Sequence, residues 1–392
     1  MKSELLQREW HPTRISPAAA YVHIPFCAKK CGYCDFNAYS GYKDGTKSRY
    51  VDAICHEIAT RGAGGQPLTS VFFGGGTPTQ LPTAALVRIL DTLRETPGIA
   101  PNAEVTLEAN PNDVMLHDWS ALKNAGINRV SFGVQSFNPD VLKMIDRTHA
   151  PEDAATAIDT VRNAGISNLS IDLMFGLPRQ TLADWRRTLS HAFALEIPHL
   201  SIYGLILEEH TPFWGRLQRG RMVLPGDVAQ AAMLELAMDL SRDAGYTRYE
   251  LSNYAMNGLE SRHNRVYWRN DAYWGFGAGA VGYNNVERTT NVMRPSRYID
   301  AMLSGAPMTF EMSESPDLAG SIGETMMLGL RLPEGVTLSD VSARYGVDIR
   351  ELYADELTSG VETGLLEVVD DVVRLTKHGT MFANDAMLLF IA

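Results

Sequence analysis

Three cysteines that lie within eight residues of one another are the feature of this sequence with the clearest chemical meaning. They are Cys27, Cys31 and Cys34, in the segment HIPFCAKKCGYCDF, and their spacing is Cys-x3-Cys-x2-Cys. Three thiolates on one short loop can bind three corners of a [4Fe–4S] cluster and leave the fourth iron without a protein ligand. An iron with an open position can bind and activate a small molecule, as a catalytic zinc site with an open position does.

A structural zinc ion is the alternative for the same three thiolates. Zinc needs a fourth ligand nearby, and His23 on the preceding apolar run is the candidate. Zinc ribbons usually hold their ion between two paired cysteine turns, and this sequence has one cysteine cluster, which disfavours zinc. The fourth cysteine, Cys55, lies outside the motif on a predicted helix, and we interpret it as a small buried apolar residue.

Alternating strand and helix patterns must position this loop. Apolar runs of strand type are found at 19–26, 69–76, 104–111, 129–136, 168–178 and 199–207. Amphipathic helical patterns lie at 48–61, 82–95, 113–125, 138–145, 152–164 and 181–194. This alternation predicts an α/β fold, an incomplete (βα)6 TIM-like barrel with an open side.

Glycine-rich and polar segments lie at the carboxyl ends of these predicted strands, where such barrels bind their ligands. After the cysteine loop come GGGT at 74–77, EANP at 108–111, GVQS at 133–136 and IDLMFGLP at 171–178. The glycines permit a ligand to approach the backbone closely, although a tight turn would also explain them. Glu108 would suit a cationic ligand, and a solvated carboxylate is the alternative.

These segments resemble the radical S-adenosylmethionine (SAM) superfamily. HIPFC, YCDF, GGGTPT, EANP, SFGVQSF and DLMFGLP narrow the resemblance, over about residues 19–275, to the oxygen-independent coproporphyrinogen oxidase-like family. The resemblance implies a radical SAM barrel and a [4Fe–4S] cluster whose open iron chelates SAM. It also implies that SAM is contacted at its methionine end by Tyr21, Gly75, Gly76, Thr77, Glu108 and Arg147, at its ribose by Gln135 and Asp172, and at its adenine by Tyr33 and Ile206.

A second motif, His263-Asn-x-x-Tyr267-Trp268, resembles the signature of the heme chaperone branch of this family, the HemW type. That resemblance implies heme binding and delivery to acceptor hemoproteins such as respiratory enzymes, with His263 as the candidate heme contact. The spacing fits a helix or a strand, and aromatic residues that simply cap the barrel are the alternative.

Other members of the family set the alternatives for function. The decarboxylases have a further cysteine two residues after the third, and this chain has Phe36 there. This departure weakens an assignment as oxygen-independent coproporphyrinogen III oxidase. A radical SAM methylase of a natural product remains a third hypothesis, so whether the protein is an enzyme stays open at this point.

The remaining sequence predicts four parts. They are a polar N-terminal tail at 1–18, the radical SAM barrel at 19–245, a barrel-covering segment with the HNxxYW motif at 246–310, and an acidic winged-helix-like C-terminal domain at 311–392. From residue 311 onward there are 15 Asp and Glu against 5 Lys and Arg, a net charge of −10. This acidity favours a structural or protein-docking role for the last part over DNA binding.

Charge and hydropathy also restrict location and partners. The net charge of −11 disfavours a nucleic-acid partner bound by bulk electrostatics. No apolar run of about 18 residues and no signal-peptide core occurs, so we expect a cytoplasmic protein that meets membrane-bound acceptors through protein contacts. We also expect a reductant such as flavodoxin or ferredoxin, and we leave a homodimer open.

Overall fold

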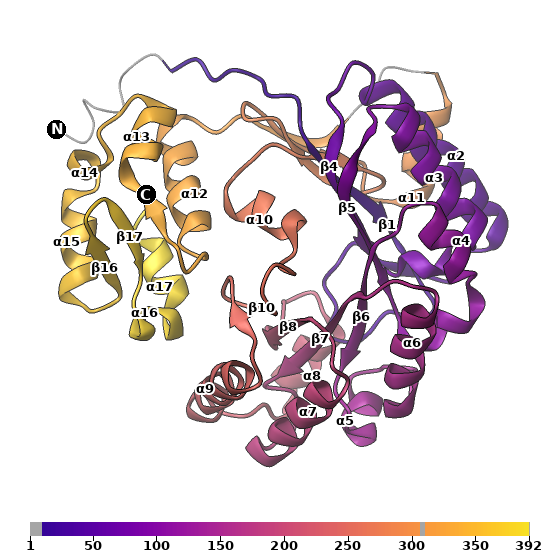
Figure 1. Cartoon of the computed structure of the whole chain (residues 1–392), viewed down its shortest axis with the longest axis horizontal. Coiled ribbons are helices and arrows are strands. Elements are labelled where there is room, and N and C mark those ends of the chain that lie inside the picture. The colour runs from indigo at the N-terminus through magenta and orange to yellow at the C-terminus, as the bar shows by residue number, and fades with distance from the viewer. Residues whose placement is uncertain (1–9, 306–309, 392) are drawn as a thin grey trace.

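The computed structural model describes residues 10–305 and 310–391, and its largest feature is an open, curved, nine-stranded sheet (Figure 1). Its centre consists of parallel strands in chain order: β1 Ala19–Ile24, β4 Leu68–Gly75, β5 Ile99–Ala109, β6 Arg129–Gln135, β7 Asn168–Phe175 and β8 His199–Gly204. Neighbouring strands pair in parallel, with a register shift in the pairings of β4 with β5 and of β6 with β7. The predicted incomplete barrel with six parallel strands is therefore confirmed.

Short strands occupy the two edges, and the sheet does not close. β11 (Trp274–Phe276) pairs parallel with β1 at one edge. At the other edge β10 (Asn253–Ala255) runs antiparallel to β8, and β9 (Thr247–Arg248) follows it. β11 and β9 are the two edges and do not pair with each other, so the sheet stays open between them.

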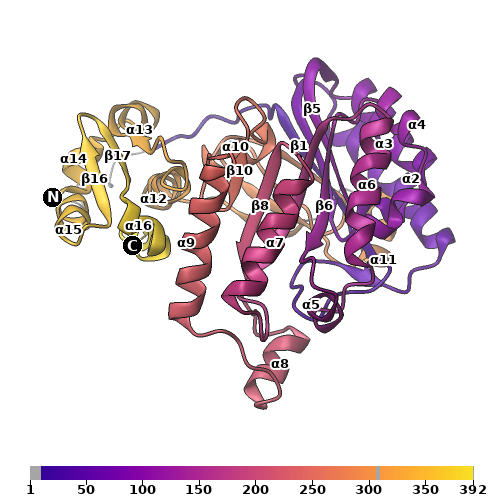
Figure 2. The ribbon, with the colours of Figure 1, turned by 60° about the horizontal axis from the view of Figure 1, so that its bottom comes forward.

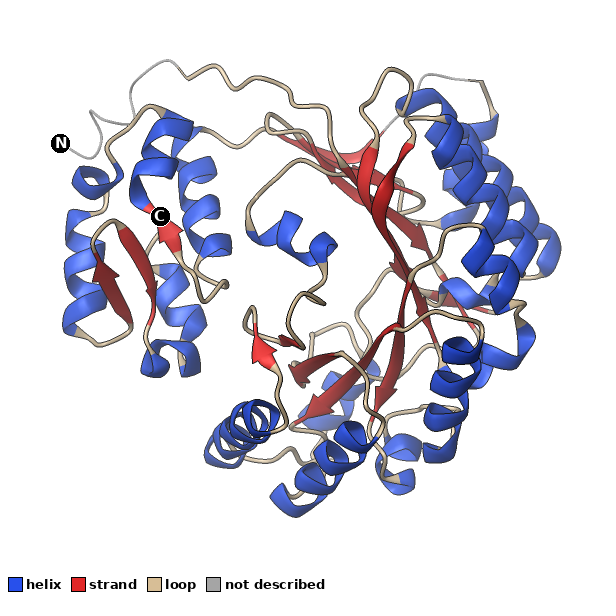
Figure 3. Ribbon diagram, in the orientation of Figure 1, coloured by secondary structure: helices blue, strands red, loops and turns tan. Residues whose placement is uncertain are grey.

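Helices cover the convex face of the sheet, as the continuous burial of its strands requires (Figure 3). In chain order the helices of this part are α2 Asp44–Arg61, α3 Thr83–Glu95, α4 Trp119–Asn124, α5 Pro139–Met144, α6 Pro151–Asn163, α7 Leu182–Ala194, α8 Pro212–Gln218 and α9 Asp227–Asp243. One large apolar core joins most of this layer to the sheet, and a smaller cluster packs α5 and α8 beside the end of β7. The predicted helix at 113–125 is interrupted: a 3₁₀ helix, η2 (Pro111–Leu116), precedes α4, whose N-cap Asp118 accepts from the backbone N–H of Ala121 at 2.9 Å.

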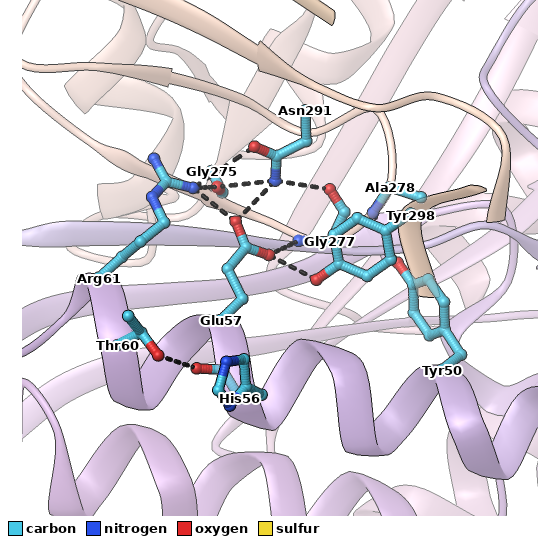
Figure 4. A network of polar contacts seen from close by, with 10 residues as sticks. All are labelled: Tyr50, His56, Glu57, Thr60, Arg61, Gly275, Gly277, Ala278, Asn291 and Tyr298. Carbon is cyan, nitrogen blue, oxygen red and sulfur yellow. Dashed lines mark hydrogen bonds and ion pairs between the residues drawn. The ribbon is translucent and has the colours of Figure 1, made fainter. Parts of the chain in front are cut away.

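The edge strand β11 is fastened to α2 by a buried polar network (Figure 4). Glu57, buried on α2, accepts from Arg61 Nη1 at 2.5 Å, from the backbone N–H of Gly277 at 2.8 Å, from Asn291 Nδ2 at 2.8 Å and from Tyr298 Oη at 2.5 Å. The bond from Arg61 lies within α2. The other three join Glu57 to residues more than two hundred positions later in the chain. The network therefore holds the barrel-covering segment against the first strands.

The covering segment adds a helix on the concave side and a second small sheet. The helix is α10 (Arg262–Trp268), so the HNxxYW motif is helical. The second sheet consists of β12 Val281–Tyr283, β13 Arg288–Asn291 and β14 Phe310–Glu314, with α11 Pro295–Leu303 between the last two. β14 crosses the predicted boundary at 310/311 and pairs with β13 of the covering segment. In Figure 1, α10 lies between the sheet and the C-terminal part of the chain.

The C-terminal part has the element order of a winged helix (Figure 2). Its buried side chains form an apolar core of their own. Its elements are α12 Leu318–Gly329, β15 Val336–Thr337, α13 Leu338–Tyr345, α14 Ile349–Leu352, α15 Ala354–Glu362, β16 Leu366–Val369, β17 Val372–Leu375, α16 Lys377–Met381 and α17 Ala383–Leu388. The three strands form a separate sheet in the order β15-β17-β16.

The predicted N-terminal tail lies partly outside the described residues, as do 306–309 of the predicted covering segment and residue 392. Where the description begins, Trp10 packs against Tyr345 of α13, with ring centroids 5.8 Å apart. Among the described helices, none combines the length and the apolar character that crossing a membrane requires.

Candidate functional site

The three cysteines of the motif lie on one loop at the carboxyl end of β1. Cys27 ends the short strand β2 (Phe26–Cys27), which pairs with β3 (Tyr39–Ser40). The backbone N–H of Cys34 donates to Cys31 O at 3.2 Å and closes the loop between them. All three thiols are partly exposed. Burial raises the pKa of the Cys27 thiol to about 11, and a bound iron would favour its thiolate form.

The arrangement favours a multi-iron cluster over a single zinc ion. Within residues 10–305 and 310–391, no three Cys, His, Asp or Glu side chains could hold one metal ion between them. His23, the candidate fourth zinc ligand, has both ring nitrogens engaged: Nδ1 lies 3.0 Å from Tyr21 Oη and Nε2 lies 2.9 Å from Asn37 O. Three thiolates that bind separate iron atoms can lie further apart than ligands of one ion, so the residues present fit a [4Fe–4S] cluster.

A cavity of about 510 Å³ opens directly beside these thiols at the carboxyl ends of the parallel strands. All of the predicted cluster and SAM residues except Tyr21 line it. They are Cys27, Cys31, Tyr33, Cys34, Gly75, Gly76, Thr77, Glu108, Gln135, Arg147, Asp172 and Ile206. Tyr21 instead lines an adjoining cavity of about 330 Å³, which shares Phe36, Gly75 and Glu108 with the first.

Gly75 and Gly76, which line the first cavity at the end of β4, leave no room for a side chain. Gly75 has φ +112°, and a Cβ there would lie 2.4 Å from the His23 ring. A Cβ on Gly76 would lie 2.8 Å from the carbonyl oxygen of Phe26. Thr77 follows and donates its hydroxyl to the Cys27 sulfur at 3.7 Å. The glycines thus bring the end of β4 against the cysteine loop.

Two partly buried carboxyl groups, those of Glu108 and Asp172, line the cavity and make it suited to a cation. Burial, and next the charge of Asp172, raise the pKa of Glu108 to about 8. Burial likewise raises the pKa of Asp172, whose Oδ1 accepts from Ser131 Oγ at 3.2 Å. A ligand with a positive charge, such as the sulfonium or ammonium of SAM, would favour their ionised forms.

Arg147 supplies the opposite charge at the rim. Its Nη2 donates to Asn110 Oδ1 at 2.6 Å and to the carbonyl oxygen of Gly133, while Nη1 lies 3.9 Å from the Cys31 sulfur. Its Nε is buried and has no partner among the described residues. An unpaired N–H of a guanidinium is suited to a carboxylate ligand.

Asn110 is a lining residue that the sequence interpretation did not single out. Besides accepting from Arg147, it donates from Nδ2 to Thr77 Oγ1 at 3.1 Å. It belongs to the EANP segment at a strand end, and this position in the sequence could have indicated that it lines the site. Tyr203, at the end of β8, also lines the cavity and was not predicted.

The two predicted adenine contacts differ in their surroundings. Tyr33 packs edge-on against Phe213 of α8, with ring centroids 6.1 Å apart, and α8 is also joined to the loop by a 2.9 Å bond from the Phe213 N–H to Gly32 O. Ile206 is 72% exposed at the mouth of the cavity. Both could pack on a flat ring that enters from the open side.

His263 lies apart from both cavities and has no exposed surface. Its Nδ1 lies 2.9 Å from Ser70 Oγ and its Nε2 lies 3.0 Å from Tyr267 Oη, while its ring stacks on Phe72. Burial, and next the charge of Arg129, lower the pKa of His263 to about 3. In this arrangement both ring nitrogens have hydrogen-bond partners, and the heme contact expected of His263 stays a prediction.

Comparison with known proteins gives the class of protein first. A model of the radical SAM superfamily matches residues 21–192, and a model of the HemN C-terminal domain matches residues 321–382. The solved coproporphyrinogen III oxidase HemN from Escherichia coli, a radical SAM enzyme, has a TM-score of 0.82 at 22% identity, covering 99% of this chain and 92% of that chain. The fold and the site define a radical SAM protein.

Relatives of similar length then give the family. The heme chaperone HemW of Bacillus subtilis is 38% identical over 95% of this chain and 99% of its own. Those of Synechocystis and Escherichia coli K12 are 40% and 33% identical, over 83% and 97% of this chain and 80% and 99% of their own. The chain therefore belongs to the HemW family.

Proposed function

We propose that the protein is a heme chaperone that holds a [4Fe–4S] cluster and SAM, binds heme and delivers it to acceptor hemoproteins. The observation that carries this proposal is the similarity to proteins named heme chaperone HemW over nearly their whole length. The helical HNxxYW motif on the concave side of the sheet supports the same assignment.

The cofactor part of the proposal rests on the cavity beside the cysteines. Cys27, Cys31 and Cys34 would hold the cluster, which when bound presents one iron without a protein ligand to SAM. Arg147 would pair with the SAM carboxylate, and Glu108 with its positive charge. Gly75 and Gly76 would let the ligand approach the backbone.

The decarboxylase alternative is less well supported. The likeness to HemN at 22% identity concerns the fold, and a shared fold hosts different functions. Phe36, which occupies the place of the additional cysteine, is 68% exposed and cannot bind a metal. No specific observation in the described residues favours a methylase.

Partners follow from the same chemistry. The cluster would take electrons from a reductant such as flavodoxin or ferredoxin. Acceptor hemoproteins, including membrane-bound ones, would be met through protein contacts, for which the acidic C-terminal part is a candidate surface. A homodimer would be detected in the same preparations by size-exclusion chromatography with light scattering.

A hemin titration of the anaerobically reconstituted protein tests the proposal. We expect near-stoichiometric heme binding, and transfer of the bound heme to an apo-hemoprotein added afterwards. The same preparation, given coproporphyrinogen III, SAM and a reductant, should form no decarboxylated product. Absence of heme binding together with product formation would replace the chaperone assignment by the decarboxylase.

A further inference from the structure

A short basic segment packs directly on the cysteine loop. It comprises α8 and the turn that follows it, residues 212–226, and it contains Arg216, Arg219 and Arg221 but no Asp or Glu. The whole chain has a net charge of −11, so this segment differs in charge from most of the molecule. In Figure 2, α8 projects beyond the neighbouring helices α7 and α9, where a partner can reach it.

The inward side of α8 fixes the helix to the cysteine loop. The backbone N–H of Phe213 donates to Gly32 O at 2.9 Å, and the Phe213 ring centroid lies 6.1 Å from that of Tyr33. A Cβ on Gly32 would lie 2.4 Å from the Phe213 ring, so the helix and the loop are in close contact. Because Gly32 and Tyr33 stand between Cys31 and Cys34, the position of α8 is tied to that of the cluster ligands.

The outward side of the segment carries the arginines. Arg216, Arg219 and Arg221 are exposed, and within residues 10–305 and 310–391 no carboxylate pairs with any of them. The Arg216 guanidinium lies 5.1 Å from the centroid of the Phe213 ring, the same ring that contacts the loop. Arg187 on α7, by contrast, pairs with an aspartate of its own helix. The charge of the segment is therefore available to a partner.

The position and size of the segment indicate what that partner is. Exposed cations that lack counter-charges attract a partner of opposite charge, and arginine is enriched at protein interfaces. Val223, which is 71% exposed, adds an apolar contact. Small interfaces are typical of transient electron-transfer complexes. A protein that docks here lies next to the loop that would hold the cluster, and electron transfer through protein falls off steeply with distance.

We propose that residues 212–226 are the docking surface for an acidic protein electron carrier that reduces the cluster. This inference rests on the proposed [4Fe–4S] cluster and adds the place at which its reductant binds. In each encounter the reduced carrier loses one electron to the cluster, and no bond forms or breaks. The three arginines lie outside both cavities, so they would act on the encounter and not on SAM.

An anionic lipid surface is the other partner that such a charge would attract. Helices that lie on membranes present a broad apolar face to the lipid. The helix α8 has seven residues and turns its Phe213 ring into the protein, where the ring is fully buried. The observations therefore favour a protein carrier.

Stopped-flow reduction of the cluster-loaded protein tests the docking surface, with flavodoxin hydroquinone and reduced ferredoxin as the acidic carriers. The triple variant Arg216→Gln/Arg219→Gln/Arg221→Gln should be reduced about tenfold more slowly than the wild type at low salt. The difference should shrink at high salt, because ions screen exposed charges. Photoreduced 5-deazariboflavin, a small uncharged reductant, should reduce both proteins at the same rate.

A charge-matched variant is the control. Replacing Arg162, Arg186 and Arg187 by Gln removes the same charge from α6 and α7 on the convex face, and these proteins should be reduced like the wild type. Surface plasmon resonance with immobilised oxidised flavodoxin gives a readout without electron transfer. The docking variant should bind about fivefold or more weakly than the control.

Three outcomes would overturn the docking surface. They are equal carrier kinetics and binding in the two triple variants, slower reduction of the docking variant by deazariboflavin as well, and reduction of the wild type by deazariboflavin but by neither carrier. Loss of binding to phosphatidylglycerol vesicles with unchanged carrier kinetics would assign the arginines to a lipid surface instead. If no reductant bleaches the cluster of the wild type, it is the proposed cluster that fails.

Discussion

The guanidinium of Arg147 lies with Nη1 3.9 Å from the sulfur of Cys31, although 116 positions separate the two residues in the chain. Arg147 follows α5, beyond the end of β6, and Cys31 lies in the loop that follows β1. Because β1 and β6 are parallel strands of one curved sheet, their carboxyl ends face the same cavity. The contact joins the cluster loop to the rim that would hold the SAM carboxylate.

Replacing Arg147 by Met should weaken SAM binding by about tenfold, because a charge-assisted hydrogen bond to the carboxylate is lost. The measurement is isothermal titration of SAM into the anaerobic, cluster-loaded protein. Arg162→Met on α6 is the control, since Arg162 pairs with Asp159 on the outer surface. Equal SAM affinity in the two variants would remove Arg147 from the site.

Replacing any one of Cys27, Cys31 and Cys34 by Ser should abolish stable cluster assembly, because a hydroxyl is a poor substitute for a thiolate ligand of iron. Cys55→Ser, a change on the buried side of α2, should keep its full iron and sulfide content. Iron and acid-labile sulfide analysis after reconstitution provides the readout. Retention of a full cluster in a single-cysteine variant would contradict the assigned ligands.

Glu108 should make folding stability fall as pH rises. Its pKa of about 8 in the folded protein exceeds the ordinary value of 4.5, so between these values the folded state holds a proton that the unfolded state has lost. The buried His263, with its pKa lowered to about 3, has the opposite effect below its ordinary value of 6.5, so the window from pH 6.5 to 8 separates the effect of the carboxyls from that of His263.

Urea unfolding of the metal-free protein across that window checks this expectation. The free energy of unfolding should fall with pH in the wild type and fall less in Glu108→Gln. Some decrease should remain, because burial also raises the pKa of Asp172. Glu362→Gln, an exposed change on α15, should follow the wild type. A wild-type slope in Glu108→Gln would refute the shift.

Arg331 should hold the C-terminal part against α10. Its guanidinium lies 4.1 Å from the centroid of the Trp268 ring, and Nη2 lies 3.4 Å from Oε2 of the fully buried Glu250. Arg331→Met leaves that carboxylate without its cation and should lower the free energy of unfolding by about 3 kcal/mol. Arg374→Met, which removes a surface pair with Glu367, should cost at most about 1 kcal/mol.

Thermal unfolding and limited proteolysis of these two variants are the measurements. In Arg331→Met the segment before α12 should be cleaved faster, because the docking of the C-terminal part is weakened. If the two variants are equally stable and equally resistant, the contact with Glu250 and Trp268 contributes nothing to docking.

Most of the sheet could be predicted from the sequence because its signals are local. Each parallel strand is a nearly continuous apolar run, and its helix follows with an apolar stripe, so the six repeats could be recognised without knowing their neighbours. The split of the predicted helix at 113–125 was missed because it depends on Trp119, whose indole donates to Val114 O within the folded chain.

The sequence alone determined that the three cysteines and the strand-end motifs would form one site. The cysteines share one loop, and the carboxyl ends of parallel strands lie at the same edge of the sheet. Tertiary structure decided which face of the HNxxYW helix is turned inward. Glu104 on β5 accepts from the backbone N–H groups of Arg262 and His263, each at 3.0 Å, and this distant cap fixes the rotation of α10. A seven-residue helix with polar and aromatic residues on every side carries no apolar stripe to specify that rotation, so His263 became buried and Tyr267 faced the cavity.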